Sequence, residues 1–186
     1  MYSLPIFFDT NFRYCDRIEV TETFAKAIKG KELSEFRKPI FKDSVWLMQK
    51  LKKSTEFDFY EEQKPAPNNY TGKVYILING LCASSCADIA AILSYNKKAV
   101  FIGEETGGGF QGNTSGIVAV ATIKPGNFIL ALPFQKYFNA VDPTLNVGHG
   151  TLPDYPVELT PEDLIKGNDI AMKKVLELIK NNRNQD

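Results

Sequence analysis

The sequence "LINGLCASSCADIAAIL", residues 77–93, joins an apolar run to an apolar helical pattern through a cluster of small residues. The run before it is rich in β-branched and aromatic residues and stops at Asn79-Gly80, which predicts a buried strand. Residues 87–95 are expected to form a helix. Ser84 and Ser85 therefore lie where a helix begins, and where unpaired amide groups and the helix dipole favour negative charge.

Ser85 has two possible roles at this junction. Ser85-x-x-Asp88 has the pattern of a capping box, in which Ser85 would be the N-cap and the Asp88 side chain would reach back to it. Alternatively, the Ser85 hydroxyl could attack a carbonyl carbon while a neighbouring amide stabilises the oxyanion. The residues of the junction leave both roles open.

Composition restricts the function classes. The chain has 186 residues, of which 44% are hydrophobic, so it can form one compact domain or slightly more. Its formal net charge is zero, which argues against a nucleic-acid partner. No apolar run approaches the length that spans a bilayer, and the N-terminal residues lack the pattern of a signal peptide.

Cysteine and histidine usage restricts the chemistry further. Three cysteines are few and odd in number, which argues against a disulfide framework. Cys82 and Cys86 have i, i+4 spacing, but no histidine or acidic residue nearby completes a zinc site, so we expect neither a metal nor a cofactor. His149 is the single histidine, and a Ser-His-Asp arrangement built from this chain alone would have to use it.

Strands alternate with helices after residue 73, which predicts parallel β-α-β pairing and an α/β fold with a mixed sheet. The same reading predicts a hairpin of residues 117–123 and 128–134 around Lys124-Pro125-Gly126-Asn127. The other expected elements are strands at 17–20, 57–60, 99–102 and 153–159, a flexible loop at 107–116, and helices at 23–28 (capped by Thr21 or Thr23 and ended by Gly30), 33–51 (interrupted near Pro39), from Thr160, and 169–181.

A wider set of motifs changes the weight of the alternatives. In order, they are "YTGKVY" at 70–75, Asn79, "SCAD" at 85–88, "AVFIGEETGG" at 99–108 and "GHGTLPDYPV" at 148–157. This ordered set resembles the catalytic core of serine peptidase family S41, the C-terminal processing and tricorn-like proteases. No single piece is specific, but their order over residues 70–158 is.

The resemblance implies a ClpP/crotonase-like core with a mixed β-sheet flanked by helices, and a serine endopeptidase that forms an acyl-enzyme with a polypeptide substrate. Ser85 rather than Ser84 takes the nucleophile position, because Asp88 follows it by three residues as the family's acid does. The amide of Cys86 would stabilise the oxyanion, and Gly107 and Gly108 would let a peptide lie against the sheet edge. Relatives often work in the bacterial periplasm or envelope. Acyl-CoA chemistry shares this fold, but the sequence offers only scattered lysines for the CoA phosphates.

The chain departs from the family at the general base. The loop at 107–111 has no lysine, no histidine precedes His149, and the Asp-Leu-Arg-x-Asn-x-Gly-Gly segment is not found. Val147 stands near the family's glutamate. His149 is the remaining candidate base within the chain, and Glu104 and Glu105 either orient a base, hold the loop near the serine, or are solvated.

These gaps lead to two expectations. The chain could be the C-terminal part of a longer peptidase whose base lies upstream, with a lead-in of helix and loop at 1–69, a core at 70–158 and C-terminal helices at 159–186 in one domain. Otherwise it is a degenerate member that binds peptides without cutting them.

Overall fold

The computed structural model describes residues 4–28, 36–50, 61–116 and 118–183. The predicted strand at 57–60 and Gly30 lie outside the described residues. The helices are η1 (Leu4–Phe7), α1 (Glu22–Ala27), α2 (Ser85–Tyr95), α3 (Pro161–Lys166) and α4 (Ile170–Arg183). The strands are β1 (Cys15–Val20), β2 (Phe36–Lys42), β3 (Val45–Lys50), β4 (Tyr75–Ile78), β5 (Val100–Gly103), β6 (Gly112–Asn113), β7 (Val118–Ile123), β8 (Phe128–Pro133), β9 (Gln135–Asn139) and β10 (Tyr155–Pro156).

The predicted β-α-β unit is confirmed. Strands β10, β5 and β4 form a parallel sheet in that order, and α2 connects β4 to β5. The carboxylate of Asp154, just before β10, accepts a hydrogen bond of 2.7 Å from the amide of Phe101 in β5. Asp154 therefore attaches β10 to β5.

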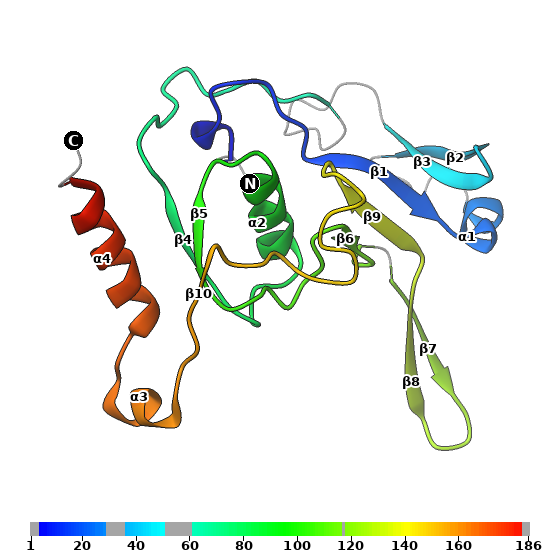
Figure 1. Cartoon of the computed structure of the whole chain (residues 1–186). Helices are drawn as coiled ribbons and strands as arrows, with labels where there is room; N and C mark the ends of the chain where they lie inside the picture. The colour runs from blue at the N-terminus through cyan, green and yellow to red at the C-terminus, as the bar shows by residue number, and fades with distance from the viewer. Residues whose placement is uncertain (1–3, 29–35, 51–60, 117, 184–186) are drawn as a thin grey trace.

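The other strands form two antiparallel sheets. One has the order β2-β3-β1-β9-β6, and the other is the predicted β7–β8 hairpin. Helix α2 lies between the parallel sheet and the five-stranded sheet (Figure 1). The α/β class is confirmed, with parallel and antiparallel strands in separate sheets.

The core forms around α2 because its small and branched side chains allow both sheets to approach. Ala91, Ile92 and Leu93 are buried, as are Phe101 of β5 and Ile18 of β1. Burial of side chains of this size is the main stabilising contribution to such a fold. Helix α2 is therefore fixed from both sides, and its first residues have a defined position.

The predicted helix at 33–51 is wrong. The described part of this segment is the β2–β3 hairpin, in which Lys42 pairs with Val45. The two turn residues, Asp43 and Ser44, have φ of 49° and 69°. Positive φ at both positions is the geometry of a tight hairpin turn, whose local preference outweighed an apolar spacing that also suits a helix.

Two short strands were also missed, and three predicted helices are confirmed. Strand β6 lies in the segment expected to be a flexible loop, and β9 follows directly on β8. Thr21 caps α1, and Thr160 forms a capping box with Asp163 at α3. Helix α4 matches the predicted amphipathic segment, although among its apolar stripe Leu176 remains 58% exposed.

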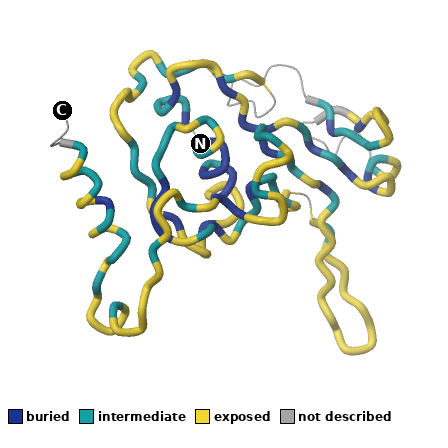
Figure 2. Tube along the Cα trace, viewed as in Figure 1, coloured by how far each residue is buried: buried dark blue, intermediate teal, exposed yellow. Residues whose placement is uncertain are grey.

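Figure 2 shows that exposed residues follow the β7–β8 hairpin over nearly its whole length. Among the residues that the structure describes, there is no helix whose length and apolar character would let it cross a membrane.

Candidate functional site

The residues between β4 and α2, Asn79–Ser84, form a tight turn that we call the nucleophile turn. The side-chain oxygen of Asn79 accepts the amide of Leu81 at 2.9 Å, and its carbonyl accepts the amide of Cys82 at 3.0 Å. Ser84 is the N-cap residue of α2, with φ of 54°, and its side chain makes no capping hydrogen bond. An uncommon backbone conformation for a non-glycine residue is therefore held at the step before Ser85.

The capping-box role predicted for Ser85 is wrong. Ser85 is already the first residue of α2, and Asp88 does not reach back to it. The Asp88 carboxylate is instead buried at 8% exposure, and its two oxygens accept the Asn113 side-chain amide at 3.0 and 3.1 Å. The hydroxyl of Tyr14 lies 3.5 Å from the same carboxylate. Asp88 thus joins the start of α2 to β6 and to the beginning of β1.

A cavity of about 180 Å³ opens at this position, and Ser85 and Asp88 both line it. Most of its other lining residues come from β1, β6 and β9. Those not recognised in the sequence are Tyr14, Cys15, Asn113, Ser115, Tyr137 and Asn139, and Ser84 completes the lining. The signal in the sequence that could have pointed to this cavity is the pair of polar residues Asn113 and Asn139, which lie at the ends of β6 and β9. None of the lining residues in the described part of the chain is a histidine or a lysine.

Burial shifts the pKa values of the titratable side chains that line this cavity. It raises the pKa of Asp88 above its usual value, against the opposing effect of hydrogen bonds from Asn139, Asn113 and Tyr14. Burial and the negative charge of Asp88 raise the pKa of Tyr14, and burial raises the pKa of Cys15 to about 12. The Cys15 thiol is therefore neutral at physiological pH and is a poor nucleophile.

The two cysteines around Ser85 form a disulfide, Cys82–Cys86, with a Cα–Cα distance of 5.4 Å. The small, odd number of cysteines argued against a disulfide framework, and this bond is a correction to that expectation. The bond closes the nucleophile turn onto the first turn of α2. Ser85 lies inside the closed loop, so its backbone has little freedom.

The glycine loop after β5 packs directly on the nucleophile turn. The Gly108 amide donates to the Cys82 carbonyl at 3.0 Å, and a side chain at Gly107 would collide with the Gly80 carbonyl oxygen. The Cys86 amide, the expected oxyanion donor, donates to the Ala83 carbonyl at 3.2 Å. Gly108 thus supplies close approach to the turn, and its amide is already paired.

His149 and Glu105 contact each other beside the glycine loop. The Nδ1 atom of His149 is 3.3 Å from Oε1 of Glu105, and the same oxygen accepts the Gly150 amide at 2.7 Å. Gly150 in turn pairs with Gly109 in an isolated β-bridge. The carboxylate therefore ties the His149 segment to the loop that covers the nucleophile turn. Glu104 is exposed.

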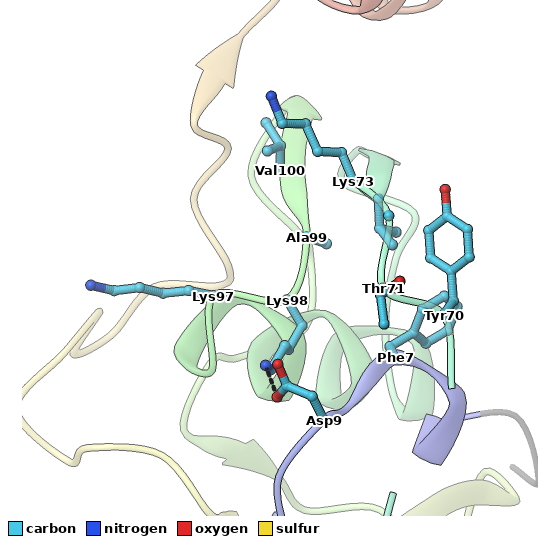
Figure 3. Close-up of a pocket in the computed structure, with 11 residues that line it drawn as sticks. Phe7, Asp9, Tyr70, Thr71, Lys73, Lys97, Lys98, Ala99 and Val100 are labelled. Carbon is cyan, nitrogen blue, oxygen red and sulfur yellow. Dashed lines mark hydrogen bonds and ion pairs between the residues drawn. The ribbon is translucent and has the colours of Figure 1, made fainter. Parts of the chain in front are cut away.

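Another hollow, of about 310 Å³, lies at the amino ends of β4 and β5 (Figure 3). Lys98 forms an ion pair with Asp9 there, and this hydrogen bond lowers the pKa of the Asp9 carboxyl. Lys73 and Lys97 point away from each other and from that pair. The contact ties the N-terminal segment to the residues after α2. It lies at the amino ends of β4 and β5, whereas Ser85 follows the carboxyl end of β4.

Replacing Gly108 by alanine should destabilise the site. A Cβ atom at Gly108 would lie 2.5 Å from Cβ of Ala87 and 3.1 Å from Cα of Ala83. We expect the free energy of unfolding to fall by about 1–3 kcal/mol, as for other overpacked positions. Gly80→Ala is the matched control, because a Cβ there meets nothing within 4 Å. Urea unfolding that shows equal stability for both variants would contradict this packing.

The burial of Asp88 predicts a pH-dependent stability. Because the folded-state pKa is raised, the contribution of this group is fully present below the ordinary pKa of 3.8 and is lost as pH rises through the folded-state value. The Asp88→Asn variant has no charge to bury. Its stability relative to the wild type should therefore increase as pH rises above 3.8, measured as urea midpoints from pH 3.5 to 7. A difference that stays constant over this range would contradict the prediction.

Comparison with known proteins agrees with the fold and the motifs. The structure superposes, with a TM-score of 0.57 and 15% identity, on the crystal structure of a protein from Parabacteroides merdae described as a "putative peptidase". The match covers 95% of this chain and 45% of that one, so the chain spans less than half of that protein's length. No curated protein is significantly similar in sequence. The family description "Peptidase family S41" matches residues 23–157, and the chain belongs to that family.

Proposed function

We propose that the chain is a serine-type endopeptidase domain in which Ser85 is the nucleophile. The Ser85 oxygen bonds to the carbonyl carbon of a peptide, and its proton passes to a general base. The base then protonates the leaving amine as the carbon–nitrogen bond breaks, and water releases the acyl group from Ser85. The polypeptide substrate follows from the family membership of the chain.

One observation carries this proposal. Ser85 is the first residue of a helix, lines a cavity, and is fixed by a disulfide and by the packing of Gly108. A helix N-terminus favours an oxyanion. Cys86 would stabilise the oxyanion after its amide exchanges the 3.2 Å bond with Ala83 for one with the substrate.

His149 is the base that this chain can supply. Glu105 lies beside its Nδ1 atom, and a proton held there leaves Nε2 as the acceptor, which is the arrangement of a carboxylate-oriented base. The β-bridge between Gly109 and Gly150 supports this role, because it joins the His149 segment to the glycine loop, whose Gly108 amide bonds the Cys82 carbonyl of the nucleophile turn. In the proposed reaction, His149 takes the proton of Ser85 when a peptide is bound.

The Cys82–Cys86 disulfide supports a location in an oxidising compartment, since structural disulfides persist outside the reducing cytosol. We propose the periplasm or the cell envelope as the site of action.

A second candidate function is peptide binding without cleavage on the same fold. The observation in its favour is that the amides of Gly108 and Cys86 are paired with carbonyls, while the described residues that line the Ser85 cavity include no histidine or lysine. A binding domain would keep its affinity for peptides in a Ser85→Ala variant and would show no turnover.

A fluorophosphonate probe tests the nucleophile. In the complete protein, the probe should phosphonylate Ser85 with loss of fluoride, and mass spectrometry of the digest should map the adduct. Ser85→Ala should abolish labelling and peptide cleavage, whereas Ser84→Ala should retain both. An adduct on Ser84, or no adduct on a protein shown by circular dichroism to be folded, would refute the assignment.

Variants of the His149–Glu105 pair test the base. We expect His149→Gln to lower the rate of probe labelling by about 100-fold or more, the usual contribution of a general base. Glu105→Gln keeps an oxygen that can accept the Gly150 amide, so its effect should be smaller, about tenfold. Labelling rates that are equal in His149→Gln and the wild type would assign the base to a different residue.

A further inference from the structure

A groove of about 660 Å³ lies on the other side of the nucleophile turn from the Ser85 cavity. Cys86 lines the groove and Ser85 lines the cavity, so the two hollows meet at consecutive residues. Strands β4 and β5 contribute one wall, and the segments before and within α4 contribute the other. Figure 1 shows α4 beside β4 with α3 below it. The groove therefore begins at the helix turn that carries Ser85.

The groove has an apolar floor that remains exposed to solvent. Leu77 of β4 and Leu159 are 40% and 38% exposed, and Leu81 of the nucleophile turn is 90% exposed. The Asn79 side chain accepts the Leu81 amide, and this bond fixes the turn that presents Leu81. Because the backbone of this turn is already fixed, binding orders only the leucine side chain, and covering that side chain with an apolar partner contributes about 1.5–3 kcal/mol before this cost.

The edge of the groove is acidic. Glu104 and Asp169 both line it and are exposed. The Glu104 carboxylate makes no hydrogen bond or ion pair with another described residue, and Asp169 uses one oxygen to accept the Met172 amide at 2.8 Å. The neighbouring Lys173 is engaged with Asn168 at 3.0 Å. Two carboxylates at the rim of an apolar groove complement an apolar side chain that has a cationic neighbour.

We infer that this groove is a specificity site that binds a polypeptide segment in which an apolar residue adjoins a lysine or arginine. Leu81 contacts the apolar side chain, and Glu104 and Asp169 attract the cation. The inference rests on the proposed function, since it names the substrate class of the same site.

Binding to the Ser85→Ala protein tests the groove without requiring turnover. The probes are four fluorescent peptides of equal length that contain Leu-Lys, Leu-Glu, Ser-Lys or Ser-Glu at the centre, measured by fluorescence polarisation. Leu-Lys should bind about tenfold more tightly than Leu-Glu in low salt, and this advantage should shrink in 0.5 M salt. Equal affinities for the four peptides, or no binding, would overturn the inference.

Two variants locate the effect. Leu81→Ser should weaken the Leu peptides about fivefold or more and leave the Ser peptides unchanged. Glu104→Gln should lower the affinity ratio of the Leu-Lys to the Leu-Glu peptide about threefold. Leu132→Ser on the β7–β8 hairpin and Glu162→Gln on α3 are the matched controls. A uniform loss across all four peptides, or a groove occupied by a second copy of the chain in sedimentation and protection experiments, would contradict the assignment.

Cleavage assays separate this inference from the proposed function. Peptides that bind with the Leu-Lys preference but are not cut by the wild-type protein would leave the groove assigned and refute the peptidase. Cleavage of all four peptides at equal rates would support the peptidase and refute the specificity of the groove.

Discussion

The contact between the glycine loop and the nucleophile turn is the constraint on which the site depends. The Gly108 amide holds the Cys82 carbonyl, and any side chain at Gly108 would meet the start of α2. The turn cannot relax away from this loop, because the Cys82–Cys86 disulfide closes its other side. The backbone of Ser85 is thus placed by hydrogen bonding, a covalent bond and close packing together.

The same constraint connects features that lie far apart in the sequence. The glycine loop carries Glu105, which holds the His149 segment, and Cys86 of the disulfide lines the apolar groove next to Ser85, which lines the polar cavity. Asp88, in the first turn of α2, joins this helix to the five-stranded sheet through Asn113 of β6. A substrate would therefore meet a rigid serine between two hollows of different character: a small polar one over a buried carboxylate and a larger apolar one with an acidic edge.

Sequence patterns predicted the parts of this arrangement that are local. The buried strand that stops at Asn79-Gly80, the helix of residues 87–95 and the caps at Thr21 and Thr160 follow from neighbouring residues. The order of the motifs along the chain identified the family, and the match of residues 23–157 to peptidase family S41 agrees with it. The β2–β3 hairpin was missed because the apolar spacing of residues 33–51 also suits a helix, and because Asp43-Ser44 was not recognised as the turn that pairs the two strands.

What escaped prediction depends on contacts between distant segments. Nothing near Tyr14 or Asn139 in the sequence indicates that they share a cavity with Ser85, and the odd cysteine count concealed a disulfide that leaves Cys15 free. The measurement that tests the account most directly is a crystal structure of the complete protein with a peptide boronic acid that carries leucine beside lysine. The account predicts a covalent bond from boron to the Ser85 oxygen, with the leucine against Leu81. A bond to Ser84, or an adduct that leaves the groove empty, would contradict it.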